Sequence, residues 1–181
     1  MATQSEIIEA TIFVFAYKPD ATMTDVADKA GVTRVTINRK FGSKQNLLDQ
    51  AAAHCIKEFD YVLRKTKSAK KSPMEKIILV LRGYYGLKNH YFFLMRTMVD
   101  DQSTYKKNYL RQLEIIEKLV IAAQENGDIR NDLPSGWVAS FFDFIIIAAC
   151  TSRFRGIVAE RDMLSIALNT LQFGISPQKA F

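Results

Sequence analysis

Apolar residues recur every three or four positions along almost the whole chain, and this spacing constrains the fold more than any other feature. Between Gln4 and Tyr17, isoleucines, a phenylalanine and an alanine would line one side of a helix. The 181 residues include only four prolines and eight glycines, and no segment requires a strand. The pattern predicts an all-α protein with helices near residues 4–17, 22–30, 33–41, 43–63, 73–87, 91–99, 103–126, 135–158 and 161–173.

Side chains that can cap a helix precede the first four helices, namely Thr3, Thr22, Thr33 and Ser43. Glu6 follows Thr3 by three residues, which is the spacing of a capping box, and Asp25 follows Thr22 in the same way. Pro19 ends the first helix because a proline disfavours helical geometry in the residue before it. Gly31 permits a sharp turn between the second and third helices.

The segment from Thr22 to Leu48 carries the main functional signal. In its first helix Val26, Ala27 and Ala30 are expected to face inward, and Ile37 and Phe41 anchor the second helix to the same core. This arrangement predicts a three-helix head with a helix-turn-helix, over residues 1–50. The remaining side chains of the second helix would lie mostly outside: Thr33, Arg34, Val35, Thr36, Asn38, Arg39 and Lys40.

These exposed side chains are suited to the major groove of DNA. Arginine can bind guanine, asparagine can bind adenine, and a valine or threonine methyl can contact a thymine methyl. Four basic residues and no acidic residue lie between Thr33 and Lys44. We assign Arg34, Val35, Asn38 and Arg39 to the bases or their neighbours, and Thr33, Thr36, Lys40 and Lys44 to phosphates, with Thr22 as a further DNA-binding residue. The alternative is a basic surface helix in an ordinary bundle.

Residues 5–50 resemble the DNA-binding head of the TetR family of regulators. The matching pattern consists of Thr22, Val26-Ala27, Ala30-Gly31-Val32-Thr33, Thr36-Ile37, Phe41, Ser43-Lys44 and Leu47-Leu48. Val35 replaces a frequent glycine of the family, and Asn38 and Lys40 replace its usual tyrosines. The loop at residues 18–21 is about two residues shorter than usual. The resemblance implies a sequence-specific transcriptional regulator, a repressor that a small-molecule effector releases from its operator.

A basic segment, residues 64–73, separates the head from the rest of the chain. It contains five basic residues, no acidic residue and a closing proline. We interpret it as a loop, either a solvated connector or a direct contact with DNA. The formal net charge of +6 is compatible with a polyanionic partner but does not establish one.

Residues 51–181 are predicted to form a helical domain for effector binding and dimerisation. A single helix-turn-helix reads too few base pairs, so we expect a homodimer on a palindromic operator. The expected dimer interface consists of Phe141, Ile145, Ala149, Leu164, Leu168 and Leu171. The same residues could instead fill the core of one chain.

The resemblance implies an effector pocket among the aromatic and methionine residues of the middle helices. The expected lining for a small apolar or aromatic effector is Tyr84, Tyr85, Tyr91, Met95, Met98, Tyr105, Tyr109 and Phe141. Asn89, His90, Arg96 and Arg153 are candidate polar anchors. An aromatic stripe of this kind can equally be plain core.

Other functions find less support in the sequence. The apolar segment from Trp137 to Cys150 is interrupted by Ser140 and Asp143 and is shorter than a membrane span, so we expect a cytoplasmic protein. Cys55 and Cys150 are expected to be buried free thiols. The two histidines lie in different segments without a catalytic or metal-ligand spacing, so we expect no enzyme activity, cofactor or metal. The remaining alternative is a helical adaptor or ligand-binding protein that has lost operator recognition.

Overall fold

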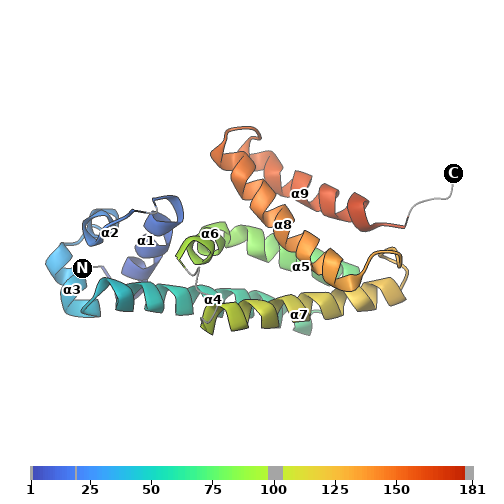
Figure 1. Ribbon diagram of the computed structural model, residues 1–181, viewed down its shortest axis with the longest axis horizontal. Coiled ribbons are helices and arrows are strands. Elements are labelled where there is room, and N and C mark those ends of the chain that lie inside the picture. Colours follow the sequence, from blue (N-terminus) through green and yellow to red (C-terminus); the bar gives the residue numbers. More distant parts are fainter. Residues whose placement is uncertain (1, 19, 98–103, 178–181) are drawn as a thin grey trace. The chain divides into compact units, whose positions relative to one another are not determined.

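The computed structural model describes the chain except for residues 1, 19, 98–103 and 178–181 (Figure 1). Within the described part every regular element is an α-helix, which confirms the all-α prediction. The helices are α1 (Gln4–Tyr17), α2 (Met23–Ala30), α3 (Arg34–Phe41), α4 (Lys44–Ser68), α5 (Pro73–Gly86), α6 (Lys88–Thr97), α7 (Thr104–Glu125), α8 (Ser135–Phe154) and α9 (Glu160–Ile175). Of the predicted helix over 91–99, Met98 and Val99 lie outside the described residues.

Side-chain caps define the starts of the early helices, as the sequence predicts. Thr3 and Glu6 form a capping box at α1, and Thr22 and Asp25 form one at α2. The hydroxyl of Thr33 accepts a hydrogen bond from the Thr36 amide at the start of α3. Each cap satisfies an amide that the helix itself leaves without a partner, and so fixes where the helix begins.

Gly31 ends α2 in the left-handed region, with φ 65° and ψ 35°. A Cβ atom at this position would meet nothing within 4 Å, so substitution would introduce backbone strain alone. We expect Gly31→Ala to lower the free energy of unfolding by about 1–2 kcal/mol, the cost of left-handed geometry for an L-residue. Urea unfolding followed by circular dichroism measures this change.

Gly86 provides the matched control for that substitution. It lies in α5, and a Cβ atom there also meets nothing within 4 Å, but its φ is not left-handed. Gly86→Ala should therefore leave stability unchanged or raise it by about 0.5–1 kcal/mol, because alanine favours helix over glycine. Equal losses of stability at both positions would contradict the backbone argument.

The chain folds into two compact units, residues 1–59 with 89–108, and residues 60–88 with 109–181. In the first unit α2 packs against both α1 and α3. Its core includes Ile7, Ile12, Val26, Ile37, Phe41, Leu47 and Phe93, all at most 2% exposed. The buried thiol of Cys55 belongs to this unit, and burial raises its pKa, as expected for a core thiol.

In the second unit α8 packs against α9 and both contact α5. Its fully buried side chains include Ile77, Leu81, Ile129, Phe142, Ile146 and Met163. Cys150, the second cysteine, is also buried here and forms no disulfide, as the sequence predicted. Phe142 packs edge-on against Tyr84 of α5, with ring centroids 6.0 Å apart. Among the residues that the structure describes, several large apolar side chains of α8 and α9 remain exposed outside this core.

The prediction of a loop over residues 64–73 is wrong for residues 64–68. Helix α4 continues to Ser68, so only residues 69–72 connect it to α5. Thr66 is 5% exposed and helps to bury this last stretch. Lys65 and Lys67 lie in the last turn of α4, where a positive charge interacts favourably with the helix dipole. The basic run therefore ends a helix instead of interrupting one.

Helix α8 differs from the prediction in two respects, the residue at which it ends and its continuity. It ends at Phe154, four residues before the expected end, and it is continuous over 20 residues. Ser140 and Asp143 do not interrupt it, and Ser135–Ser152 is long and apolar enough to cross a membrane by length and composition. Only 33% of that window is buried inside the chain. Helix α8 thus packs on α5 and α9 and also exposes large apolar side chains, among them Trp137 and Phe144.

Candidate nucleic-acid interface

Helices α2 and α3 form the predicted helix-turn-helix. After Gly31 the chain turns, and the amide of Val32 donates a hydrogen bond to the carbonyl of Ala27 at 3.0 Å. Ile37 is 0% exposed and Phe41 is 2% exposed, so these two side chains fix one face of α3 to the core. Ala30, in contrast, is only half-buried, so the close packing of α2 rests on Val26 and Ala27.

The exposed face of α3 is set by this anchoring. Successive helical residues are about 100° apart, so Val35 and Arg39 lie roughly 160° around the helix from Ile37. Val35 is 75% exposed, which is unusual for a β-branched apolar residue, and Arg39 is also exposed. Asn38 flanks this pair and is exposed, whereas Thr36 is half-buried. The outer face therefore contains three of the four side chains assigned to bases, with Val35 and Arg39 at its centre and Asn38 beside them.

The interface is basic. Arg34, Arg39 and Lys40 are all exposed, and none of them forms an ion pair with another residue that the structure describes. No acidic residue lies between Thr33 and Lys44. Such a surface attracts phosphates at long range and leaves the guanidinium groups available for guanine.

The threonines assigned to DNA also hold the local structure. Thr33 and Thr36 place their hydroxyl oxygens 3.0 Å apart at the start of α3. Thr22 donates its hydroxyl to Asp25 at 2.7 Å, and Lys18 pairs with the same carboxylate at 2.7 Å. The Lys18 ammonium, followed by Thr22, holds the pKa of Asp25 far below its usual range. Any contact of these hydroxyls with phosphate would be added to a capping role.

Lys44 is partly engaged within the first unit. Its ammonium donates to the carbonyl of Ala21 at 2.9 Å and lies 4.9 Å from the centre of the Phe15 ring. The start of α4 is further fixed by Ser43, whose hydroxyl accepts from the Asn46 amide, and by the Asn46 side chain, which donates to the carbonyl of Phe41 at 2.7 Å. This role of Asn46 was not predicted from the sequence, although its position three residues after a capping serine could have indicated it.

We expect Lys44→Ala to weaken binding to every duplex sequence by a similar factor. Loss of one phosphate contact per chain should lower the slope of log affinity against log salt by about 0.9 per site. Titrations at several salt concentrations measure the slope. Lys107→Ala, which removes an exposed lysine of α7, is the matched control. An unchanged slope for Lys44→Ala would assign this lysine to the Ala21 contact alone.

The residues predicted for an effector pocket are divided between the two units. Tyr91, Met95 and Tyr105 belong to the first unit, and Tyr84, Tyr85, Tyr109 and Phe141 to the second. Met98 lies outside the described residues, and the side chain of the candidate anchor Arg153 is not described either. Tyr84 is buried, whereas Met95 and Tyr109 are 45% and 43% exposed.

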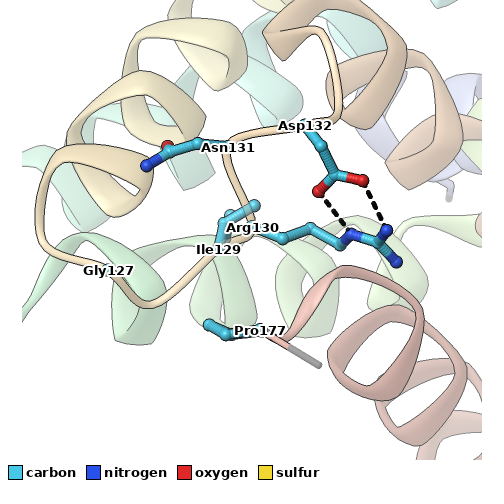
Figure 2. A pocket seen from close by; sticks show the side chains of 6 residues that line it. All are labelled: Gly127, Ile129, Arg130, Asn131, Asp132 and Pro177. Atoms are coloured by element: carbon cyan, nitrogen blue, oxygen red, sulfur yellow. Dashed lines mark hydrogen bonds and ion pairs between the residues drawn. The ribbon is translucent and has the colours of Figure 1, made fainter. Parts of the chain in front are cut away.

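Two depressions occur elsewhere on the described surface. The larger is about 470 Å³ and is lined by Gly127, Ile129, Arg130, Asn131, Asp132 and Pro177 (Figure 2). Figure 2 shows Arg130 turned toward Asp132, with which it forms a two-pronged ion pair. The second is about 320 Å³ and is lined by Glu6, Glu9, Ala10, Ile12, Phe13, Lys29 and Asn89. None of the eight predicted lining residues borders either depression, whereas Asn89, one of the candidate polar anchors, lines the second.

The predicted dimer residues are only partly accessible. Ile145 and Leu171 are 5% and 1% exposed, so they fill the core of their own chain and cannot reach a second copy without rearrangement. Phe141, Ala149, Leu164 and Leu168 are half-buried. The large apolar side chains that α8 and α9 expose most are Trp137, Phe144, Ile166 and Phe173, between 47% and 76% exposed. These four are the better candidates for an interface.

Comparison with known proteins supports the helix-turn-helix. Residues 7–51 match the family model described as bacterial regulatory proteins, tetR family. The chain is also 20% identical over 156 residues to the HTH-type transcriptional regulator NfxB of Pseudomonas aeruginosa, covering 84% of this chain and 83% of the relative.

Solved structures of similar fold cover almost the whole chain. One is the TetR-like transcriptional regulator LfrR of Mycobacterium smegmatis, solved in complex with proflavine. It matches with a TM-score of 0.73 at 19% identity, over 96% of this chain and 96% of its own. The ketosteroid transcriptional regulator KstR2 of Mycobacterium tuberculosis has a TM-score of 0.80 at 16% identity, over 97% of this chain and 95% of its own. Residues 7–51 thus belong to the TetR family of bacterial regulatory proteins, and the chain as a whole has the fold of the TetR-like transcriptional regulators.

Proposed function

We propose that this DNA-binding regulator is a cytoplasmic repressor that binds a palindromic operator as a homodimer and is released by a small-molecule effector. The observation that carries the proposal is the outer face of α3. Ile37 and Phe41 fix the helix from behind, so Val35, Asn38 and Arg39 project together from a surface free of acidic residues between Thr33 and Lys44. This is the arrangement that major-groove reading requires.

Base reading and phosphate binding are divided over this surface. We propose that Arg34, Val35, Asn38 and Arg39 contact bases, with the Val35 methyl groups against a thymine methyl. Thr33, Thr36, Lys40 and Lys44 then contact phosphates, and Thr22 is a further DNA-binding residue. Thr22 and Thr33 also cap the starts of α2 and α3. Asn38 and Lys40 stand where the family has tyrosines, so the operator should differ from those that tyrosine-bearing relatives read.

The proposed dimer forms through α8 and α9. Trp137 and Phe144 on α8 are each 65% exposed, and Phe173 on α9 is 76% exposed. Large apolar patches that face solvent in a single chain usually mark an interaction surface. A two-fold interface over these helices would bury them and present two copies of α3 to the two halves of a palindrome.

Stoichiometry on DNA tests the dimer proposal. Light scattering of the protein with a palindromic duplex should give two chains per duplex, and a duplex with one half-site should bind much more weakly. One chain per duplex, with equal affinity for the half-site, would contradict dimeric operator recognition.

The effector part of the proposal rests on likeness to regulators such as LfrR, which was solved with proflavine. A ligand releases the operator only if it binds the released conformation better than the DNA-bound one. The first compounds to test as effectors are an aromatic cation, a steroid and a long-chain acyl compound. We expect at least one to raise the melting temperature and to weaken operator binding. A compound that stabilises the protein but leaves operator affinity unchanged would argue against release by that class.

A further inference from the structure

Both histidines of the chain meet a glutamate in the first compact unit. Glu9 lies on α1, His54 on α4 and His90 on α6, and one ligand atom from each lies within 4.8 Å of the other two. These three residues, the Glu9 cluster, are separated by 45 and 36 positions along the chain, so their spacing in the sequence gave no indication of a site. Folding alone brings them together, against the expectation of no metal site.

The two imidazoles converge on one carboxylate oxygen. His54 Nε2 lies 2.8 Å from Glu9 Oε1, and His90 Nε2 lies 3.5 Å from the same oxygen. The two rings are 5.9 Å apart between centroids. The ring nitrogens that can bind a metal therefore face the same small volume as the carboxylate.

His90 has a particular need for a further partner. Its side chain is only 11% exposed, and its Nε2 makes no hydrogen bond with any residue that the structure describes. The 3.5 Å contact with Glu9 is an electrostatic approach that does not satisfy this nitrogen.

We propose that Glu9, His54 and His90 bind a divalent transition-metal ion of the zinc type. Two imidazoles and one carboxylate match the three protein ligands of zinc sites that leave a fourth position open. Hard cations such as Mg²⁺ prefer oxygen ligands throughout, so the two imidazoles select zinc, cobalt, nickel or copper instead.

Two of the three separations in the cluster are close to those of such a site, and the third, between the ligand atoms of the two imidazoles, lies within 4.8 Å. Ligand atoms around a tetrahedral zinc lie about 3.3 Å apart, from metal-ligand bonds of roughly 2.0–2.1 Å. The separation of 3.5 Å between His90 and Glu9 already agrees with this value. The separation of 2.8 Å between His54 and Glu9 must widen by about 0.5 Å as metal bonds replace the hydrogen bond.

The cluster is open to solvent on one side. Glu9 is 49% exposed, and it lines the depression of about 320 Å³ together with residues of α1, α2 and Asn89. An ion can therefore reach the carboxylate first and then the more buried imidazoles. Once bound, it would connect α1, α4 and α6 within the first unit.

Metal titration of the full, tag-free chain tests the proposal. After chelator treatment, Co²⁺ should bind with one equivalent per chain and give visible ligand-field absorption, which Zn²⁺ should abolish by displacement. Zn²⁺ should also raise the melting temperature. Because the readout is metal binding, the result does not depend on whether the protein binds DNA.

Variants locate the site. Loss of an outer-shell partner alone costs about 10- to 100-fold in metal affinity, so loss of a ligand in Glu9→Gln, His54→Gln or His90→Gln should cost at least about 100-fold. Glu125→Gln, at an exposed position of α7, and Cys55→Ser, which tests binding through the adjacent thiol, should retain wild-type affinity. Glu9 is half-exposed, so its variant should fold even if His90→Gln does not. Absence of stoichiometric binding, or equal affinity in wild type and Glu9→Gln, would overturn the proposal.

Discussion

Replacing Arg39 with alanine is expected to weaken binding of the proposed dimer to its operator by about 30-fold to 20,000-fold. Arg39 lies opposite the buried Ile37 on α3, where a side chain reaches furthest from the core. Loss of a base-reading arginine costs about 1–3 kcal/mol. A dimer loses two such contacts at distant sites, so the costs should add to about 2–6 kcal/mol.

The substitution should also relax base preference at one position of each half-site. Titrations with the operator and with a scrambled duplex separate base reading from phosphate binding. Arg82→Ala, at an exposed position of α5, is the matched control and should have no effect. Equal losses on both duplexes would assign Arg39 to phosphate, and no loss would remove α3 from the recognition surface.

Replacing Phe144 with glutamate is expected to dissociate the proposed dimer. Phe144 is 65% exposed on α8, within the surface proposed as the two-fold interface. Burial of a phenylalanine contributes about 1.5–3 kcal/mol, and each dimer would lose two of these contributions. The two introduced carboxylates would add the cost of buried, unpaired charge. The dimer dissociation constant should therefore rise by at least about 100-fold, and operator binding should weaken with it.

Sedimentation velocity at several protein concentrations measures this change. Ile121→Glu introduces the same charge at an apolar residue of α7 that is 42% exposed, so it controls for a general loss of solubility. Dissociation by Ile121→Glu, with Phe144→Glu still dimeric, would move the interface from α8 to α7.

The head could be predicted closely from sequence because its signals are local. A capping threonine, a left-handed glycine and a buried pair four residues apart each act within one turn of helix. Thr22, Gly31, Ile37 and Phe41 have the conformations and burial that these local rules require. The exposed set on α3 followed directly from this anchoring.

Features that depend on long-range packing could not be predicted in the same way. Charge suggested a loop after Leu63, but arginine and lysine are good helix formers, and the burial of Thr66 shows that packing continues α4 to Ser68. Periodicity likewise identified the apolar residues of α8 and α9 without showing which ones the chain covers. It placed Ile145 at an interface, whereas that residue is buried and Phe144 is exposed.

The Glu9 cluster is another feature that depends on long-range packing and could not be predicted from the sequence. Its three side chains come from α1, α4 and α6, and each looks unremarkable beside its neighbours in the sequence. Only the packing of these helices brings two imidazoles to one carboxylate. The residues predicted for an effector pocket come from both compact units, and their grouping stays a prediction.

Selection of bound duplexes from a random DNA library, with retention tested at rising salt, is the most direct test of the account. We predict one palindromic motif whose half-sites are centred about one helical turn, or a multiple of it, apart. Binding to this motif should persist at salt concentrations that remove unrelated duplexes. Recovery of no motif, with all binding lost at moderate salt, would contradict operator recognition by α3 and would favour a helical adaptor with a basic surface.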